Sequence, residues 1–431
     1  MIELKWRAAF YTFGCKVNQY ETQAMRQIME KAGFHIVPEG ERADIHIINT
    51  CTVTGISDRK ARKLIRHIHR LHPEAFIVVT GCYAERAARE ISSIEGVGLI
   101  LGNREKEKIA DRIATALGIK TDLPCEGRLQ VERFDGQTRA TVKVEDGCDS
   151  FCAYCIIPFV RGPVRSRPIN EAVAEVERLA LAGHREIVVT GIHLGAYGRD
   201  WGGEPSLVDL LGRIKEVDGI ERVRLSSLEP MDVTDELIAL MSSDPKFAHH
   251  LHISLQSGSD RILKLMRRNY TADQFAEIVD KARAAMPDIG ITTDIIVGFP
   301  GEREEDFRAS YEFAEKMRFS RIHVFRFSPR PGTPAARMSD RVPPNVIKRR
   351  SEEMIALGRR LMSQFAESLV GTRQKVLLEE ESETGMLSGF TGNYVRAIVK
   401  APLEMKGRMA EIFIGDHMDE KVIGRIEGRR S

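Results

Sequence analysis

The chain has 431 residues and a formal net charge of only +2 at pH 7, with 42% hydrophobic and 29% charged residues. This composition is ordinary for a soluble globular protein of two to four domains, and the charge does not by itself indicate nucleic-acid binding. The longest apolar runs are of strand length, far short of the ~18 residues of a membrane span, and the N-terminus lacks the layout of a signal peptide. We therefore expect a cytoplasmic protein, in which clustered cysteines indicate metal or redox sites.

Three of the seven cysteines, Cys15, Cys51 and Cys82, each follow a segment with strand character in the first 137 residues. The expected strands cover residues 7–12, 44–49 and 76–80, and the expected helices cover residues 21–31 and 56–71. Their alternation predicts an open parallel α/β sheet, in which sites gather at the carboxyl ends of the strands. We therefore expect these three residues, called here the sheet cysteines, to converge on one metal cluster. Three unrelated buried cysteines are the alternative.

Three further cysteines lie close together in the sequence. Cys148, Cys152 and Cys155, called here the loop cysteines, have the spacing C-x3-C-x2-C, and such short spacings turn several thiolates toward one centre. A structural zinc site usually takes four ligands, but the next histidine downstream is His184. A four-iron cluster held by three thiolates instead leaves one iron open for a small molecule. A zinc knuckle or three unrelated cysteines are the alternatives, and Cys125, in a Pro-containing connector, is expected to be incidental.

Residues 138–340 alternate between strand and helix patterns at ~30-residue intervals, as parallel barrels do. The expected strands cover residues 138–144, 186–190, 222–226, 249–254, 290–297 and 321–325. Six βα units are too few for a closed eight-stranded barrel, so we predict an open partial (β/α)6 barrel with its chemistry at the strand ends. Gly191 and Gly298 lie at two of these ends, where the lack of a side chain lets a backbone approach a ligand.

The pattern changes again after residue 340. Residues 341–369 indicate a linker helix, and short strands at 374–379, 387–391, 395–399 and 409–414 indicate a small antiparallel β-barrel within residues 370–431. Phe390 and Tyr394 are candidates for RNA contact, and Tyr394 could stack on a base; for either residue, a place in the core of the barrel is the alternative. Basic stretches at residues 58–70, 161–167 and 348–350 suit a phosphate backbone, with a solvated helix face as the alternative.

The loop-cysteine motif, with Tyr154 as an aromatic residue before its third cysteine, resembles that of the radical S-adenosylmethionine (SAM) enzymes. A three-cysteine domain ahead of such a core resembles the methylthiotransferases, and this resemblance covers essentially the whole chain. Phe13–Thr22 is similar to the branch that modifies threonylcarbamoyladenosine in tRNA. The isopentenyladenosine branch typically has Gln-Met after that cysteine and the ribosomal-protein branch Pro-Lys, whereas this chain has Lys16-Val17. The C-terminal segment resembles the TRAM domain, an RNA-binding barrel.

This resemblance implies SAM and two [4Fe-4S] clusters as cofactors. The cluster on the loop cysteines would reduce SAM to release a 5′-deoxyadenosyl radical, which makes these residues catalytic, and the cluster on the sheet cysteines would hold or supply the sulfur. The resemblance further implies a cofactor pocket lined by Tyr154, Gly191, Glu229, Ser254, Gln256, Asp294 and Gly298. Arg161 and Arg165, just past the loop cysteines, would reach RNA phosphates or the SAM carboxylate.

The resemblance therefore implies a monomeric radical SAM enzyme that adds a methylthio group to C2 of N6-threonylcarbamoyladenosine at position 37 of tRNA. Its expected partners are the tRNA anticodon stem-loop and an external electron donor. The alternatives are a sister branch acting on isopentenyladenosine or on an aspartate of a ribosomal protein, a non-catalytic cluster-bearing RNA-binding protein, and a zinc-dependent RNA-binding module. The expected domains are an N-terminal domain (1–137), a radical SAM core (138–340), the linker helix (341–369) and a TRAM-like barrel (370–431).

Overall fold

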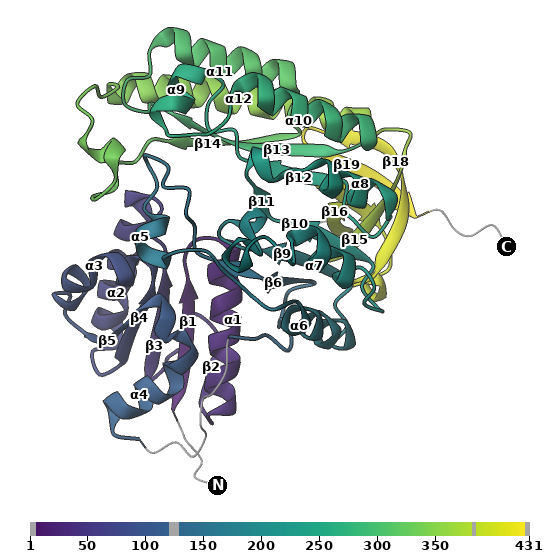
Figure 1. Cartoon of the computed structure of the whole chain (residues 1–431). Helices are drawn as coiled ribbons and strands as arrows, with labels where there is room; N and C mark the ends of the chain where they lie inside the picture. The colour runs from purple at the N-terminus through teal and green to yellow at the C-terminus, as the bar shows by residue number, and fades with distance from the viewer. Residues whose placement is uncertain (1–5, 120–128, 382–384, 427–431) are drawn as a thin grey trace. The chain divides into compact units, whose positions relative to one another are not determined.

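The computed structural model describes residues 6–119, 129–381 and 385–426 (Figure 1). The chain forms two compact units, each assembled from separate stretches of sequence. The first unit comprises Met1–Glu132, Asp146–Pro163 and Ser328–Ala336, and the second comprises Arg133–Glu145, Val164–Phe327 and Arg337–Ser431. The sheet cysteines and the loop cysteines therefore belong to the same unit. Cys125 lies outside the described residues, and the bounds of the four expected domains stay predictions.

The first unit is built on a sheet of five parallel strands in the order β2-β1-β3-β4-β5. The strands are β1 (Arg7–Thr12), β2 (His35–Val37), β3 (Ile45–Thr50), β4 (Phe76–Gly81) and β5 (Val97–Leu101). The central strand β3 is buried at every position, as expected for a parallel strand covered on both faces. The three predicted strands are present, and the structure adds β2 and β5 at the two edges of the sheet.

Helices cover both faces of this sheet (Figure 1). They are α1 (Lys16–Lys31), α2 (Gly55–Leu71), α3 (Cys82–Ser92) and α4 (Ile109–Leu117), and a short helix α5 (Ile157–Arg161) follows the loop cysteines. Ile65 and Tyr83 pack α2 and α3 against one face, whereas Met25 and Ile113 pack α1 and α4 against the other. The helices α1, α2 and α3 each begin shortly after a strand, so their N-termini lie at the carboxyl edge of the sheet.

The second unit contains two parallel sheets, with strand orders β10-β9-β6 and β11-β12-β13-β14. The strands are β6 (Arg139–Lys143), β9 (Glu186–Thr190), β10 (Arg222–Leu225), β11 (Ser227–Leu228), β12 (His250–Ile253), β13 (Gly290–Val297) and β14 (Arg321–Arg326). Two-residue strands β7 (Glu145–Asp146) and β8 (Arg165–Ser166) follow β6 in the chain. The helices are α6 (Ile169–Leu181), α7 (Leu207–Ile214), α8 (Asp235–Ser243), α9 (Asp260–Leu265), α10 (Ala272–Ala285) and α11 (Glu304–Met317).

The C-terminal part of the second unit is a long helix followed by a closed β-barrel with the strand order β15-β16-β17-β19-β18. The elements are α12 (Pro344–Ser368), β15 (Arg373–Glu381), β16 (Leu387–Thr391), β17 (Arg396–Lys400), β18 (Met409–Met418) and β19 (Lys421–Ile426). The linker helix and four of these strands match the sequence prediction. The strand β19, whose inward positions are Val422 and Gly424, was not predicted. A glycine inside a strand weakens the apolar alternation.

The predicted α/β fold class is confirmed, with a parallel N-terminal sheet, parallel central sheets and a closed C-terminal barrel. The barrel is not wholly antiparallel as predicted, because β17 and β19 pair in parallel. Among the described residues, none of the helices carries an apolar stretch long enough to cross a membrane.

Candidate active site

The sheet cysteines follow three neighbouring strands of the first unit. Cys15 caps the N-terminus of α1 after β1, Cys51 directly follows β3, and Cys82 opens α3 directly after β4. Since β1, β3 and β4 are adjacent, their carboxyl ends lie side by side. The strand order reverses between β1 and β3, and ligands of doubly wound sheets bind outside the carboxyl ends at such a reversal. The fold thus brings the three residues to one edge, where the sequence predicts their convergence.

The thiols of the sheet cysteines are close enough to affect one another. Burial, followed by the charges of Cys82 and Cys15, raises the pKa of Cys51 to about 11. Such thiols lose their protons readily only when a bound metal takes up the negative charge. The side-chain amide of Asn103 lies 3.9 Å from the Cys82 sulfur and donates to it. A Cβ atom on Gly14 would lie 2.9 Å from the Cys51 sulfur, so the glycine lets this cysteine approach the neighbouring loop.

The loop cysteines sit on a segment whose two ends are tied together. The backbone N–H of Cys148 donates to the carbonyl oxygen of Gly162 at 3.0 Å. Gly147, with a φ of +93°, lies so close to the chain that a Cβ atom there would be 2.0 Å from the Pro163 oxygen. The N–H of Ser150 donates to the Cys148 sulfur at 3.5 Å. A sulfur that accepts a hydrogen bond is stabilised as a thiolate, the form that binds metal.

Both cysteine sets supply three thiolates, the donors that iron–sulfur clusters and zinc ions both take. Within the described part of the chain, no three His, Cys, Asp or Glu side chains gather closely enough to hold one metal ion. Each thiolate of a cubane cluster binds its own iron, so the sulfurs stand farther apart than the four ligands of a zinc ion. The soft thiolate donors also match the preference of such clusters.

Arg161 does not lie on a surface open to RNA. Its side chain, at the end of α5, is fully buried and pairs with Glu21 at 2.8 Å and with Asp146 at 3.0 Å. Burial lowers the pKa of Arg161, but Cys82, Glu21 and Asp146 outweigh it and hold that pKa well above its usual range. The guanidinium N–H groups of Arg161 already bond to residues of the first unit. The burial therefore disfavours the predicted contact with RNA phosphates or SAM. Arg165 is half-buried in β8, and its RNA contact stays a prediction.

In the second unit, the predicted SAM-pocket residues lie at the carboxyl ends of parallel strands. The positions are Gly191 after β9, Glu229 after β11, Ser254 and Gln256 after β12, Asp294 within β13, and Gly298 after β13. Gln256 has a φ of +66°, and its backbone N–H donates to the Asp294 carbonyl at 2.8 Å. A left-handed non-glycine residue is strained, and such strain concentrates where a fold clamps a ligand. Tyr154 is half-buried among the loop cysteines of the first unit.

Two carboxylates of this predicted pocket have cationic or imidazole partners that the sequence analysis missed. Glu229 forms an ion pair with Arg268, and the Asp294 carboxylate lies 3.2 Å from His252 Nε2. Both partners orient a carboxylate that would otherwise rotate freely. Arg268 follows α9 and His252 lies inside β12, so neither stands in a strand-end motif that sequence reasoning could have found.

Gly191 has a packing role besides the one predicted for it. A Cβ atom there would lie 2.6 Å from a carboxylate oxygen of Glu145. That same oxygen accepts a hydrogen bond from the backbone N–H of His193 at 2.7 Å. The small residue therefore lets the strand-end loop close over a buried carboxylate.

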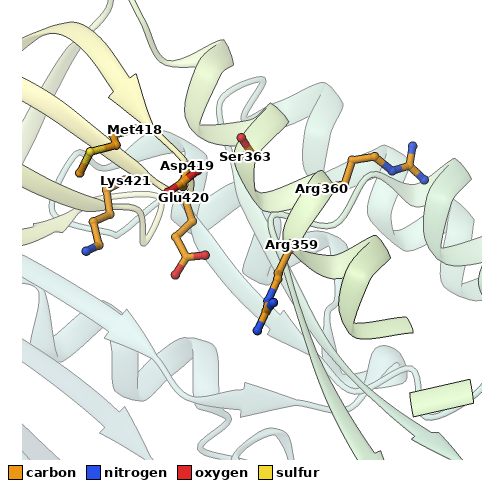
Figure 2. Close-up of a pocket in the computed structure, with 7 residues that line it drawn as sticks. All are labelled: Arg359, Arg360, Ser363, Met418, Asp419, Glu420 and Lys421. Carbon is orange, nitrogen blue, oxygen red and sulfur yellow. The ribbon is translucent and has the colours of Figure 1, made fainter. Parts of the chain in front are cut away.

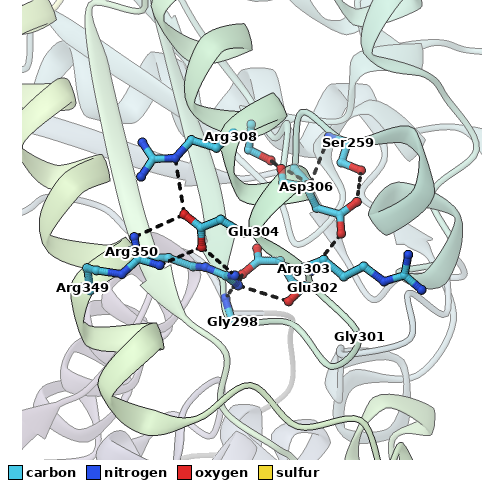
Figure 3. A network of polar contacts seen from close by, with 12 residues as sticks. Ser259, Gly298, Gly301, Glu302, Arg303, Glu304, Asp306, Arg308, Arg349 and Arg350 are labelled. Atoms are coloured by element: carbon cyan, nitrogen blue, oxygen red, sulfur yellow. Dashed lines mark hydrogen bonds and ion pairs between the residues drawn. The ribbon is translucent and has the colours of Figure 1, made fainter.

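The loop that carries Gly298 is fixed to α12 (Figure 3). The Gly298 N–H donates to the Glu302 carboxylate at 2.8 Å, and the same carboxylate pairs with Arg350 at 2.7 Å. A Cβ atom on Gly298, which has a φ of +76°, would lie 2.4 Å from Ile347 of α12. The helix that leads into the barrel thus supports the loop predicted to line the SAM pocket.

The two aromatic residues predicted to contact RNA stack on each other. The ring centroids of Phe390 and Tyr394 are 4.8 Å apart, and both residues are half-buried. The guanidinium of Arg139 lies 4.9 Å from the Phe390 ring centroid, and that of Arg224 lies 4.6 Å from the Tyr394 ring centroid. These contacts favour the packing alternative, and the RNA contact of either residue stays a prediction.

A cavity of about 500 Å³ lies between α12 and the turn that joins β18 to β19 (Figure 2). Its lining includes the basic residues Arg359, Arg360 and Lys421 and the acidic residues Asp419 and Glu420. This mixture of charges does not select an anionic ligand. The cavity contains none of the predicted SAM-pocket residues.

Comparisons with known proteins place the chain in a family. Residues 7–102 match the family described as Uncharacterized protein family UPF0004, and residues 142–314 match the Radical SAM superfamily. The threonylcarbamoyladenosine tRNA methylthiotransferase MtaB of Bacillus subtilis is 40% identical, over 94% of this chain and 93% of its own length. The protein of the same name from Thermotoga maritima is 43% identical, over 89% of each chain. The chain belongs to the radical SAM methylthiotransferases.

The similarity extends to a further relative and to a solved structure. A tRNA-2-methylthio-N(6)-dimethylallyladenosine synthase from Carboxydothermus hydrogenoformans is 35% identical to this chain. The alignment covers 94% of this chain and 95% of the synthase. Among solved structures, the radical SAM methyltransferase TsrM from Kitasatospora setae aligns with a TM-score of 0.56 and 15% identity, covering 77% of each chain. At that identity, the likeness shows the fold alone.

Proposed function

We propose that this methylthiotransferase adds a methylthio group to C2 of N6-threonylcarbamoyladenosine at position 37 of tRNA. The assignment of this substrate is carried by whole-length similarity. Four relatives named for threonylcarbamoyladenosine are 36–43% identical to the chain, whereas four named for dimethylallyladenosine are 34–36% identical. The Lys16-Val17 pair after the first sheet cysteine points to the same branch.

The geometry of the cysteines supports a radical reaction with two clusters. When bound, a [4Fe-4S] cluster on the loop cysteines supplies the electron that cleaves SAM, and a second one on the sheet cysteines holds the sulfur to be inserted. The protein orients these centres and excludes water, because the cofactors carry the difficult chemistry. The N–H groups of Ser150 and Asn103 donate to one sulfur of each set, which favours the thiolates as ligands.

The strand-end residues of the second unit are proposed to bind SAM. Glu229 and Asp294 would accept hydrogen bonds from its amino or ribose groups, while their own partners hold them in place. The Gly298 backbone, which Ile347 and Glu302 hold in place, would line the same pocket. A target adenine must also leave its stack to react, at a cost of a few kcal/mol. We further propose that the enzyme is a cytoplasmic monomer that takes electrons from an external donor and binds the anticodon stem-loop.

The decisive experiment is mass spectrometry of tRNA nucleosides from cells that carry or lack the gene. The proposal predicts that 2-methylthio-threonylcarbamoyladenosine disappears without the gene and that its unthiolated parent accumulates. Complementation by the intact gene restores the nucleoside, whereas a Cys148→Ala or a Cys51→Ala variant does not. Loss of 2-methylthio-isopentenyladenosine instead would move the enzyme to the sister branch. An unchanged set of tRNA nucleosides would refute a tRNA substrate.

A further inference from the structure

The three-residue segment Val160–Gly162 contacts the surroundings of both cysteine sets. The carbonyl oxygen of Gly162 accepts the N–H of Cys148, the first loop cysteine, at 3.0 Å. The carbonyl oxygen of Val160 accepts the side-chain amide of Asn103 at 2.8 Å, and that amide also donates to Cys82. One short stretch of backbone is therefore bonded to a loop cysteine on one side and to the partner of a sheet cysteine on the other.

Arg161 extends this connection to the other two sheet cysteines through Asn18. Its guanidinium donates to the Asn18 side-chain oxygen at 2.7 Å. The Asn18 amide in turn donates to the carbonyl oxygen of Phe13 at 2.8 Å and to that of Thr50 at 3.0 Å. Phe13 lies two residues before Cys15, and Thr50 directly precedes Cys51. The Arg161–Asn18 pair thus fixes the backbone that presents both cysteines.

The charges around Arg161 are fully enclosed. Glu21 accepts from Arg161 and from Lys106, and all three side chains are buried. Burial of a charge costs several kcal/mol, and a well-packed apolar group at such a position is often equally stable or more so. A buried ionic network is therefore weak evidence for stability alone, whereas fixing the mutual position of two elements is a better supported use of one.

We propose that Arg161 is a positioning residue that sets the sheet cysteines at a fixed place relative to the loop cysteines, so that SAM cleavage is coupled to sulfur insertion. This inference rests on the proposed function. A guanidinium can hold Asn18 and Glu21 at the same time because its donors form a planar fork, which the single ammonium of lysine cannot reproduce. Small displacements of reacting groups lower rates sharply, by about a hundredfold for 1 Å.

The test uses the full-length enzyme with both clusters reconstituted, and compares the wild type with Arg161→Lys and with the more disruptive Arg161→Ala. The control is Arg7→Lys, which alters an exposed ion pair of the same unit. The first readout is the ratio of 5′-deoxyadenosine released to methylthio nucleoside formed. The second is the magnetic interaction between the two reduced clusters in electron paramagnetic resonance spectra, which does not depend on turnover.

For Arg161→Lys we expect full iron content, a ratio raised at least about tenfold, and an altered interaction between the clusters, with the control unchanged in all three. If Arg161 acts through Asn18, adding Asn18→Ala to Arg161→Lys will not raise the ratio further. An Arg161→Lys enzyme with the wild-type ratio and wild-type spectra would overturn the proposal. If instead the wild type cleaves SAM but modifies no tRNA, the proposed function fails, and the cluster interaction alone still decides the role of Arg161.

Discussion

Two glycines of the first unit share a backbone conformation but differ in what surrounds them. Gly14 has a φ of +105° and Gly40 a φ of +89°, values that strain any residue with a side chain. A Cβ atom on Gly14 would lie 2.6 Å from the Cβ of Cys51, whereas one on Gly40 would meet nothing within 4 Å. The pair therefore separates the cost of the backbone strain from the cost of displacing a sheet cysteine.

We expect Gly14→Ala to reduce the iron content of the reconstituted enzyme to roughly half, because only the sheet-cysteine cluster is disturbed. Gly40→Ala carries the same conformational strain and should retain all its iron. Iron and sulfide analysis of the two purified variants makes the comparison. Equal iron contents would show that the approach of Gly14 to Cys51 does not matter for cluster binding.

A buried imidazole in the central strand of the first unit predicts a dependence of stability on pH. Burial, together with the nearby His72, lowers the pKa of His46 from 6.5 to about 4. The two rings stack with centroids 5.4 Å apart. Since the unfolded chain takes up the proton first, the stabilising contribution is complete above about pH 6.5 and is lost as the pH falls toward 4. The pKa difference corresponds to at most about 3 kcal/mol of folding free energy.

We therefore expect the thermal unfolding midpoint of the wild type to fall between pH 7 and pH 5 by more than that of His46→Asn. Asparagine keeps a polar atom near the Tyr11 hydroxyl, which lies 3.3 Å from His46 Nδ1, but it does not titrate in this range. Acid loss of the clusters would lower both midpoints alike, so the difference between the proteins reports the imidazole. Parallel pH profiles for the two proteins would contradict the prediction.

At the scale of elements, α12 supports the Gly298 loop through one of two adjacent arginines. Arg350 is buried and pairs with Glu302, whereas Arg349 is exposed and pairs with Glu304 and Glu353. Figure 3 shows both arginines beside Glu302 and Glu304. An exposed ion pair contributes little, but removing one partner of a buried pair leaves the other uncompensated.

Arg350→Ala should therefore weaken SAM binding about tenfold or more, equivalent to about 1.4 kcal/mol, because the Glu302 carboxylate no longer holds Gly298 in place. Arg349→Ala should stay within about twofold of the wild type. Equilibrium binding of SAM to the reconstituted enzyme measures both without any turnover. The prediction fails if the two variants bind SAM equally well.

A second buried ionic group joins the barrel to the sheet of β6, β9 and β10. Glu186 of β9 is fully buried and pairs with Arg224 at 2.8 Å and with Arg222 at 3.1 Å. Burial raises the pKa of Glu186, but these two arginines outweigh it and leave the pKa below its usual value. The arginines also donate to backbone carbonyl groups of the barrel, including those of Phe390 and Thr391. The carboxylate thus holds in place the donors that anchor the barrel.

Replacing Glu186 by glutamine leaves two buried cations without a counter-charge, and we expect the second unit to lose about 3–5 kcal/mol of stability. The matched change is Glu380→Gln, which breaks an exposed ion pair with Arg396 inside the barrel and should cost less than about 1 kcal/mol. Thermal unfolding midpoints report both effects. Equal midpoints for the two variants would mean that the buried carboxylate does not secure the barrel.

Across the whole molecule, what could be predicted from the sequence is what depends on local pattern. A strand followed by a cysteine recurs three times, so the parallel sheet and the shared edge of the sheet cysteines follow from short stretches. The six central strands and the linker helix could be predicted for the same reason. The strand β19 could not be predicted, because its glycine interrupts the alternation of side chains.

What the sequence could not provide are contacts between residues far apart in the chain. Arg161 and Glu21 are separated by 140 residues. From its sequence neighbours alone, a basic residue just past the loop cysteines is predicted to bind phosphate. Phe390 and Tyr394 were candidates for RNA contact or for core packing, and the arginines that contact their rings come from β6 and β10. In each case the partner lies far away in the chain, so no local motif could predict the contact.

The first unit is assembled from three separate stretches of the chain. This arrangement affects recombination between the genes of two family members. A single crossover near residue 137 between two members of the family would take α1 with Asn18 from one parent and the segment with Arg161 from the other. The hydrogen bonds that join them would then have to form between sequences with separate histories. We expect functional chimeras to inherit Asp146–Pro163 and Ser328–Ala336 together with the N-terminal stretch, as a block that is continuous in space and broken in the gene.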